Sequence, residues 1–147
     1  MALKLEAEDM APLMRQIFPQ VAQDFAVESL TENAATIRLR VRDDHLRPGG
    51  TVSGPSLFAL ADVAMYIALL GMIGRKALAV TTNCSIDFMR KPVGDRDLLA
   101  DARILKLGRQ LAVGDVLIRT DGTDTPVARA SLTYSIPPQG SAADIDA

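Results

Sequence analysis

The chain has 147 residues, 48% hydrophobic and 23% charged, a balance that is typical of one globular domain with a single core. The formal net charge is −2 and no basic cluster is longer than Arg90-Lys91, which excludes the basic stripe of a nucleic-acid-binding protein. The single cysteine and single histidine offer neither an internal disulfide nor a zinc site. We therefore expect no metal and a reduced, cytoplasmic setting.

The predicted elements begin with a short amphipathic helix over residues 8–18, where apolar side chains recur at helical spacing and Pro19 ends the pattern. Residues 25–41 alternate apolar and polar side chains, which predicts a hairpin of two strands with a turn at 31–33. Residues 43–51 are expected to form a loop, because they contain a proline and a glycine pair. The first nine residues are acidic and lack the apolar stretch of a signal peptide.

A long helix is predicted over residues 55–72, and it should be buried on most sides because it is apolar nearly all round. Ser53 suits the N-cap and Pro55 suits the first turn. The apolar run 57–73 is slightly short for a membrane span and contains Asp62, so we expect no membrane segment.

Four strands are predicted after the helix, over residues 77–89, 97–107, 110–120 and 127–136. Their connections carry turn residues and are short, so neighbouring strands should pair antiparallel. The simplest architecture is α+β, with an antiparallel sheet of five to six strands wrapped around one long central helix, preceded by a short N-terminal helix. We expect one domain over residues 1–136, a disordered tail over 137–147, and a homo-oligomer that covers the open edges or faces of the sheet.

Asp62 is the only charged side chain in the predicted long helix. Burial of a carboxylate costs several kcal/mol unless it is paired or neutral, and no basic residue lies one turn away. Tyr66, one turn further on, could donate a hydrogen bond. Two interpretations stay open on this pattern alone: a general base or nucleophile in a cleft, or an aspartate that only binds a neighbouring loop.

Several other residues could carry chemistry, each with a plainer alternative. Gly50 and Gly54 flank a helix start whose N–H groups could hold an oxyanion, although a capped loop is the commoner case. Asn83, Ser85 and Asp87 share one face of a strand, which is either a polar groove or a solvent-facing surface. The basic residues Arg90, Lys91 and Arg109 could bind phosphates or be solvated turn charges, and Cys84 should face the core.

Three ordered motifs stand out along the chain. The loop His45-Leu-Arg-Pro-Gly-Gly-Thr-Val-Ser-Gly-Pro55 is followed by Leu60-Ala-Asp62, the strand pattern of residues 79–92 ends in Phe-Met-Arg-Lys-Pro, and residues 108–113 read Gly-Arg-Gln-Leu-Ala-Val. In this order and spacing the motifs resemble those of the hotdog-fold thioesterases, in particular the PaaI-like group, whose strands show F-x-R-P and G-R-x-x-A-V patterns. The resemblance covers residues 27–136.

This resemblance implies an acyl-CoA thioesterase that works as a dimer or a dimer of dimers, with active sites between subunits, no metal and no cofactor beyond the CoA of the substrate. Asp62 would activate water or attack the thioester, Gly54 would hold the oxyanion, and Ser53 would either hydrogen-bond the carbonyl or cap the helix. The apolar residues favour a medium-chain or aromatic acyl group. The implied substrate-binding residues are Arg47, Gly50, Leu57, Phe58, Met65, Asn83, Arg90, Lys91 and Arg109.

The sequence departs from the family at Arg47, Ser53 and Pro55, where the pattern has asparagine, histidine and glycine. Pro55 lacks an N–H, and the loss of one oxyanion donor typically slows an enzyme about a hundredfold to a thousandfold. A hotdog protein that binds acyl-CoA without cleaving it is therefore the alternative. A hydratase or dehydratase is disfavoured because His45, the only histidine, lies well before the helix.

Overall fold

The computed structural model describes residues 2–138, so most of the predicted tail lies outside the described residues. In chain order the elements are α1 (Ala7–Ile17), α2 (Pro19–Ala22), β1 (Phe25–Thr31), β2 (Ala34–Leu39), a 3-10 turn η1 (Asp43–His45), α3 (Gly54–Ile73), β3 (Val80–Phe88), β4 (Leu98–Leu107), β5 (Leu111–Thr120) and β6 (Pro126–Ser135). The predicted helices and strands are therefore present, with ends shifted by up to three residues.

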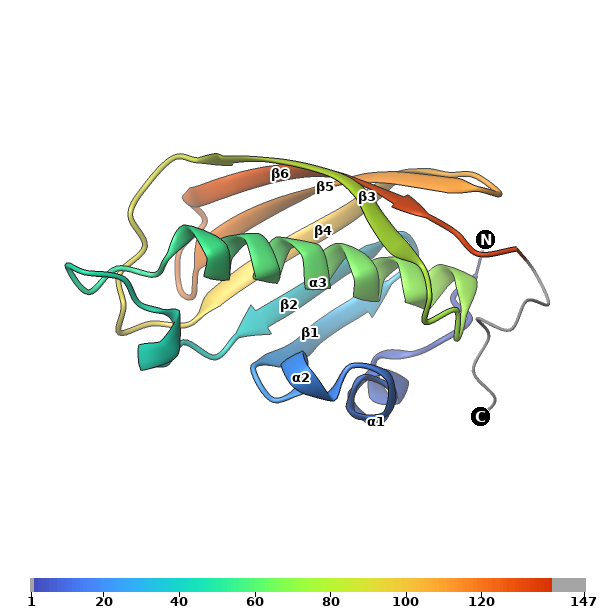
Figure 1. The fold of residues 1–147 in the computed structure, drawn as a ribbon, viewed down its shortest axis with the longest axis horizontal. Coiled ribbons are helices and arrows are strands. Elements are labelled where there is room, and N and C mark those ends of the chain that lie inside the picture. The colour runs from blue at the N-terminus through green and yellow to red at the C-terminus, as the bar shows by residue number, and fades with distance from the viewer. Residues whose placement is uncertain (1, 139–147) are drawn as a thin grey trace.

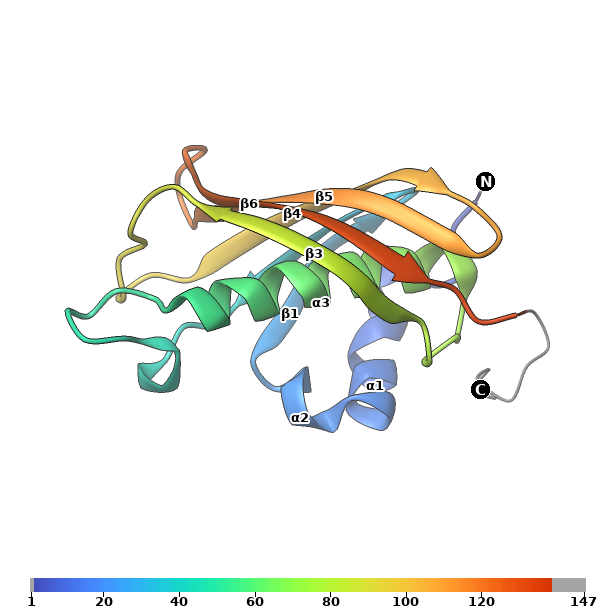
Figure 2. The same ribbon diagram turned by 45° about the horizontal axis from the view of Figure 1, so that its top comes forward.

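One antiparallel sheet of six strands, in the order β1-β2-β4-β5-β6-β3, curls around α3. Figures 1 and 2 show the sheet arching over the helix on one side, which is the hotdog arrangement that the sequence predicts. We expected strands that are joined by short connections to pair with each other. This expectation is wrong for β3, which pairs with β6 and not with β4. Residues 89–97 are long enough to carry the chain past the start of α3 to the far half of the sheet, so β3 becomes an edge strand.

The long helix α3 is the core of the molecule. It is long and apolar enough to pass for a membrane span, but 72% of its most hydrophobic window is buried inside the fold. Close packing on the sheet requires a glycine at 114, where an added Cβ would lie 2.6 Å from the sulfur of Met65. The glycine therefore lets α3 pack closely against β5.

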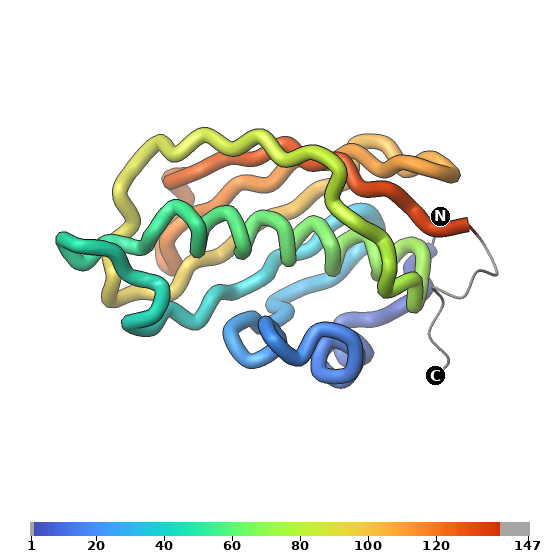
Figure 3. The backbone as a smooth tube through the Cα atoms, in the orientation of Figure 1, coloured from blue at the N-terminus to red at the C-terminus, as the bar shows by residue number. Residues whose placement is uncertain are grey.

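The two N-terminal helices cover the free edge of the sheet beside β1 (Figure 3). In α1 the buried side chains are Met10, Leu13 and Met14, which lie on one face as the apolar spacing predicts. The short helix α2 was not predicted. Pro19 ends α1 but also occupies the first turn of α2, a position where a missing N–H has no cost.

Candidate functional site

Asp62 lies on the face of α3 that opens into a cleft of about 350 Å³. The cleft walls come from three places: the α1–α2 junction, the middle of α3, and the segment leading into β3, with Tyr134 of β6 at the back. Its lining residues are Ile17, Phe18, Gln20, Asp62, Val63, Tyr66, Ala77, Ala79, Val80, Thr81 and Tyr134. The sequence-based alternative of a carboxylate facing a cleft therefore matches the geometry.

Two hydroxyl groups hold the carboxylate of Asp62. The Thr81 hydroxyl donates to Asp62 Oδ1 at 2.5 Å, and the Tyr134 hydroxyl donates to the same oxygen at 2.7 Å. No described residue hydrogen-bonds Oδ2, so that oxygen can accept a proton from a bound molecule. Tyr134 is only 2% exposed, and its burial together with the nearby charge of Asp62 raises the pKa of its phenol. Tyr134 therefore stays protonated at neutral pH and donates a hydrogen bond to Asp62.

The hydrogen bond from Tyr66 to Asp62 that the helical spacing allowed does not form. The Tyr66 hydroxyl donates instead to the backbone oxygen of Ala77 at 2.7 Å, because its side chain lies against the segment that leads into β3. Burial raises the pKa of Tyr66 to about 12. Its ring stacks on Tyr134 at a centroid distance of 6.0 Å and meets Phe18 edge-on at 6.4 Å. These three rings give the cleft an aromatic wall.

The start of α3 is a capped helix end. The Ser53 hydroxyl accepts a hydrogen bond from the Ser56 N–H at 3.3 Å and donates to the Ser56 hydroxyl at 3.0 Å. Ser53 thus acts as the N-cap, one of the two roles that the sequence left open. The N–H of Gly54 belongs to the first helical turn, which has no intrahelical acceptor, and no described residue accepts from it. An added Cβ at Gly54 would lie 3.4 Å from the ring of Phe88, which covers one side of this helix start.

The glycine-rich loop before α3 is shaped by backbone contacts. Gly49 and Gly50 both have positive φ, 100° and 80°, and the Gly50 N–H donates to the oxygen of Arg47 at 3.0 Å. A Cβ at Gly94 would lie 2.2 Å from the oxygen of Gly50, so the loop after β3 packs directly on this turn. The side chain of Arg47 is exposed beside it. The turn holds the chain in position for entry into α3.

Within one chain, Asp62 and Gly54 do not form a common site. They are eight residues apart on the same helix, which separates them by about 12 Å along its axis. A thioester carbonyl within hydrogen-bonding distance of one cannot contact the other. The structure therefore brings Asp62 together with Thr81 and Tyr134, and Gly54 with Ser53 and Phe88, as two separate halves.

The predicted substrate-binding residues are distributed over the molecule. Leu57 and Met65 are 2% and 0% exposed and pack in the core of this chain, whereas Phe58 is 40% exposed. Asn83 is exposed on β3 and faces outward with Ser85 and Asp87, as the alternation predicts.

The basic residues lie at both ends of the sheet. Arg90 and Lys91 follow β3, where the Arg90 guanidinium donates to the oxygen of Pro126 at 2.5 Å. Arg109 lies in the β4–β5 turn, next to the other end of β6. Because β6 has ten residues, roughly 30 Å separate Arg90 from Arg109 within one chain. One nucleotide cannot contact all three residues of the same chain.

The contacts of His45 and Cys84 indicate structural roles for both residues. The His45 ring accepts a hydrogen bond from the Arg42 N–H at 3.0 Å through Nδ1, and its Nε2 lies 3.6 Å from a carboxylate oxygen of Asp24. His45 thus holds the loop before α3. Cys84 packs against the core, as the strand pattern predicts, and burial together with Asp62 raises the pKa of its thiol. Among residues 2–138 no three His, Cys, Asp or Glu side chains are arranged to hold a metal ion.

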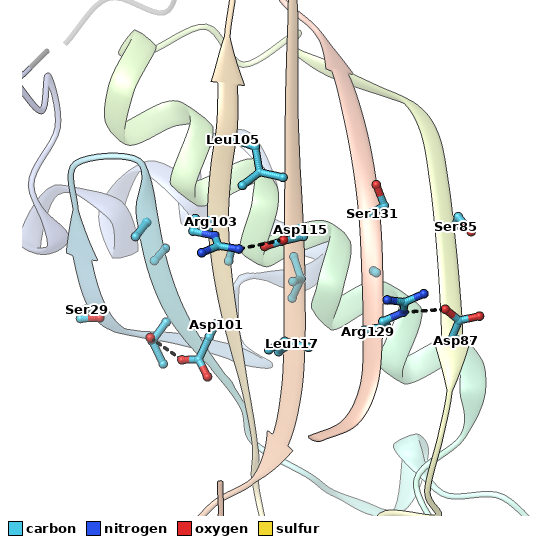
Figure 4. Close-up of a pocket in the computed structure, with 16 residues that line it drawn as sticks. Ser29, Ser85, Asp87, Asp101, Arg103, Leu105, Asp115, Leu117, Arg129 and Ser131 are labelled. Atoms are coloured by element: carbon cyan, nitrogen blue, oxygen red, sulfur yellow. Dashed lines mark hydrogen bonds and ion pairs between the residues drawn. The ribbon is translucent and has the colours of Figure 1, made fainter. Parts of the chain in front are cut away.

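Another hollow lies on the other side of the sheet, away from Asp62. It measures about 670 Å³ and is crossed by ion pairs between neighbouring strands, Arg103 with Asp115 at 3.2 Å and Arg129 with Asp87 at 2.8 Å (Figure 4). Burial disfavours ionisation of Asp101 there, but hydrogen bonds from Arg119 and Thr36 outweigh it and lower its pKa. Each charged residue that lines this hollow has an oppositely charged partner among residues 2–138, with Asp101 pairing with Arg119 at 2.8 Å.

Sequence reasoning missed Thr81 and Tyr134 as partners of Asp62. Tyr134 alternates with Leu132 toward the core, so its position predicted burial, and a buried tyrosine hydroxyl needs a partner. Thr81 gave a weaker signal, because a β-bulge between Thr81 and Asn83 shifts the alternation of β3. The identity of the partner depended on the pairing of β3 with β6, which the sequence did not predict.

Comparison with known proteins agrees with this architecture. The sequence model of the thioesterase superfamily matches residues 49–127, which is more than half of the chain. A solved structure from a Silicibacter species, described as a candidate thioesterase, is 54% identical, with a TM-score of 0.87 over 94% of this chain and 96% of that one.

Two more distant relatives point the same way. A mutant structure of the phenylacetic acid degradation protein PaaI from Thermus thermophilus is 29% identical, with a TM-score of 0.68 over 84% of this chain and 97% of that chain. A candidate esterase of Thermoplasma acidophilum is 23% identical over 113 residues, 77% of this chain and 83% of that protein. The chain belongs to the thioesterase superfamily, as a hotdog-fold thioester hydrolase of the PaaI-like type.

Proposed function

We propose that the protein hydrolyses the thioester of a medium-chain or aromatic acyl-CoA, with Asp62 as the general base or nucleophile. The observation that carries this proposal is the geometry of the Asp62 carboxylate. Thr81 and Tyr134 fix one oxygen, whereas the other has no described partner and borders a cleft. A carboxylate oriented in this way can take a proton from water.

In the proposed reaction, Asp62 removes a proton from water as the oxygen attacks the thioester carbonyl. The carbonyl oxygen becomes an oxyanion, which the Gly54 N–H stabilises together with the positive end of the α3 dipole. The carbon–sulfur bond then breaks, and the CoA thiolate takes up the proton that Asp62 carries. In the nucleophile variant, Asp62 attacks the carbonyl and the carbon–sulfur bond breaks to release the CoA thiolate. Water then hydrolyses the resulting mixed anhydride to the free acid and the Asp62 carboxylate, and a proton from water passes to the thiolate. The reaction uses no metal or separate cofactor.

The two halves of this site require a second copy of the chain. Asp62 and Gly54 are about 12 Å apart within one helix, so the oxyanion donor must come from another subunit. The edge strand β3 supports such pairing, because its outer side and flanks expose large apolar residues. Their exposed fractions are 67% for Leu78, 55% for Val80, 53% for Phe88 and 43% for Met89, and Phe58 of α3 is 40% exposed. We propose a dimer formed along this edge, and a dimer of dimers is compatible with it.

The acyl group is assigned from the cleft beside Asp62. Phe18, Tyr66 and Tyr134 provide aromatic surface, and a volume of about 350 Å³ is at the small end of ligand pockets. We propose that Arg47, Arg90 and Lys91 bind the CoA phosphates near the helix start. Arg109 can join them only from another subunit, since it lies at the opposite end of β6.

The first test measures hydrolysis of a panel of acyl-CoAs by the wild type and by Asp62→Asn. We expect the asparagine variant to lose most of the activity, because an amide cannot accept the proton. Equal rates in the two proteins would show that Asp62 has no catalytic role. In a single turnover in H₂¹⁸O, incorporation of ¹⁸O into the Asp62 carboxylate would identify the nucleophile variant, because it requires an anhydride that water attacks at the carboxyl carbon of Asp62.

A second test uses a matched pair of variants at Gly54. Gly54→Pro removes the N–H, and proline is tolerated at the first helical position after an extended residue such as Ser53. Gly54→Ala adds the same Cβ beside Phe88 but keeps the N–H. If Gly54 holds the oxyanion, the proline variant should lose about a hundredfold to a thousandfold in kcat and the alanine variant much less. Similar losses in both would point to packing.

The shared site predicts complementation between inactive variants. Asp62→Asn and Gly54→Pro, mixed after reversible dissociation, form mixed dimers in which one site has both native groups. Random association should restore roughly a quarter of the wild-type activity, given two equivalent sites per dimer. No recovery in a sample shown to contain mixed dimers would contradict a site built from two subunits.

A non-catalytic acyl-CoA-binding protein is the second candidate. It is favoured by Pro55, which removes one N–H from the helix start, and by Ser53, whose hydroxyl is engaged with Ser56. Acyl-CoA binding without turnover across the panel would support this candidate. Turnover of any substrate that depends on Asp62 would reject it.

A further inference from the structure

A second cavity, of about 630 Å³, lies between α1, α2 and β1. Its surface is mostly apolar and reaches the core helix at Ile67. The lining residues are Ala7, Met10, Ala11, Met14, Arg15, Pro19, Ala22, Gln23, Phe25, Ala26, Val27, Arg40 and Ile67. This volume is within the range of small-molecule sites, and two methionines give the cavity an adaptable floor.

The charged residues that line this cavity are both arginines, Arg15 and Arg40. Both are exposed at its rim. Arg40 donates to the backbone oxygen of Gln23 at 2.9 Å, and within residues 2–138 neither arginine forms an ion pair. The neighbouring acids are engaged elsewhere: Asp24 binds Arg42 at 2.9 Å, and Glu28 binds Arg38. The cavity therefore combines an apolar interior with two positive charges that no carboxylate neutralises.

The cavity is separate from the Asp62 cleft. The α1–α2 segment divides them: Ile17 and Phe18 line the cleft, whereas Met14 and Pro19 line the cavity. On α3 the consecutive residues Tyr66 and Ile67 point to the two different sides. A ligand in the cavity would therefore contact the outer wall of the catalytic cleft without contacting Asp62.

We infer that this cavity binds a free alkyl carboxylate, with the chain against Met10, Met14 and Ile67 and the carboxylate on Arg15 and Arg40. A guanidinium can hold a carboxylate through two hydrogen bonds, and burial of the chain contributes affinity in proportion to its apolar area. This inference goes beyond the proposed hydrolysis, because binding of an alkyl carboxylate in the cavity requires neither Asp62 nor the start of α3.

The test is calorimetric titration of the full-length protein with decanoate, using decanol and decylammonium as matched probes of the same chain length. Decanoate should bind with one site per chain, and the two probes without a negative charge should bind at least tenfold more weakly. Binding of all three probes with the same affinity would overturn the assignment of the two arginines.

Decanoate binding to variants of the cavity tests where the carboxylate lies. The double variant Arg15→Gln/Arg40→Gln keeps a donor for the Gln23 oxygen but removes both charges, and should weaken decanoate binding at least tenfold. Arg96→Gln is the control, because Arg96 is another exposed arginine that no described ion pair engages. Ala11→Phe fills the cavity from an exposed helix position, so it should block binding with little effect on folding. Circular dichroism and melting curves verify the fold of each variant.

Asp62→Asn separates this site from the catalytic one. If decanoate occupies the cavity, Asp62→Asn binds it with unchanged affinity, even if the acyl-CoA panel shows no activity. Binding that is lost in Asp62→Asn, but unaffected by Ala11→Phe and by the double arginine variant, would place the carboxylate in the Asp62 cleft and overturn the inference.

Discussion

Tyr134→Phe tests whether the buried hydroxyl group orients Asp62. The change removes the donor that lies 2.7 Å from Asp62 Oδ1 but keeps the ring that stacks on Tyr66. A hydrogen bond to a charged group contributes roughly 1.5–3 kcal/mol, and Tyr134 is 2% exposed, so water cannot easily replace the hydroxyl. We expect the melting temperature to fall by about 3–12 °C for a chain of this length.

The same variant should be a slower enzyme. With only Thr81 holding its carboxylate, Asp62 can rotate away from the attacking water, and misorientation of this kind costs up to about a hundredfold in rate. The effect should fall on kcat more than on KM, because Tyr134 lies at the back of the cleft. Steady-state kinetics with the best acyl-CoA of the panel measure both quantities.

A double-mutant cycle decides whether the hydroxyl acts through Asp62. In the Asp62→Asn background, Tyr134→Phe should cost at least about 1 kcal/mol less stability than in the wild type, because the acceptor charge is already gone. Melting curves at one fixed protein concentration give the four free energies, since an oligomer melts at a concentration-dependent temperature. Additivity within about 0.5 kcal/mol would refute the argument that the hydrogen bond couples the two residues.

Three further predictions follow from the geometry. Burial raises the pKa of Tyr66 to about 12, so the folded chain keeps a proton that the unfolded chain releases near pH 10. The free energy of unfolding should therefore fall between pH 10 and 12. Denaturant titrations should show a smaller fall over this range for Tyr66→Phe. Gly94→Ala should destabilise the protein by about 1–3 kcal/mol, because its Cβ would lie 2.2 Å from the Gly50 oxygen; an unchanged urea midpoint would contradict this. Val80→Asp, on the exposed edge of β3, should shift the protein toward monomer in sedimentation and lower activity in parallel.

The sequence predicted those parts of the fold that depend on local pattern. Apolar periodicity predicted α1 and the sides of the strands, because burial of one face follows from side-chain spacing alone. The helix α3 was predicted instead from a nearly continuous apolar run behind the N-cap Ser53 and Pro55. The pairing of β3 could not be obtained in this way. It depends on where residues 89–97 cross the molecule, and on Gly114, which lets β5 approach Met65 of the helix. Contacts between distant segments leave no signal in local spacing.

The residues of the candidate site also differ in how far local sequence pattern could identify them. Asp62 could be identified because a lone carboxylate in an apolar helix is costly, and that cost is visible in the sequence. Tyr134 could not, since it is 72 residues away and reaches Asp62 only through the order of the strands. Ser53 fitted two roles in the sequence, and the hydrogen bonds to Ser56 show that it caps the helix.

The spacing between Gly54 and Asp62 has a consequence for assembly. On a helix, eight residues separate the two groups by about 12 Å, so the same spacing that identifies them also keeps them apart within one chain. The proposed dimer would resolve this with a two-fold axis beside β3, because an isologous interface that brings Asp62 of one subunit to Gly54 of the other necessarily does so twice. The apolar side chains of Leu78, Val80 and Phe88 would then be covered by the same contact that completes both sites. On this reasoning, activity and dimerisation should have the same dependence on protein concentration.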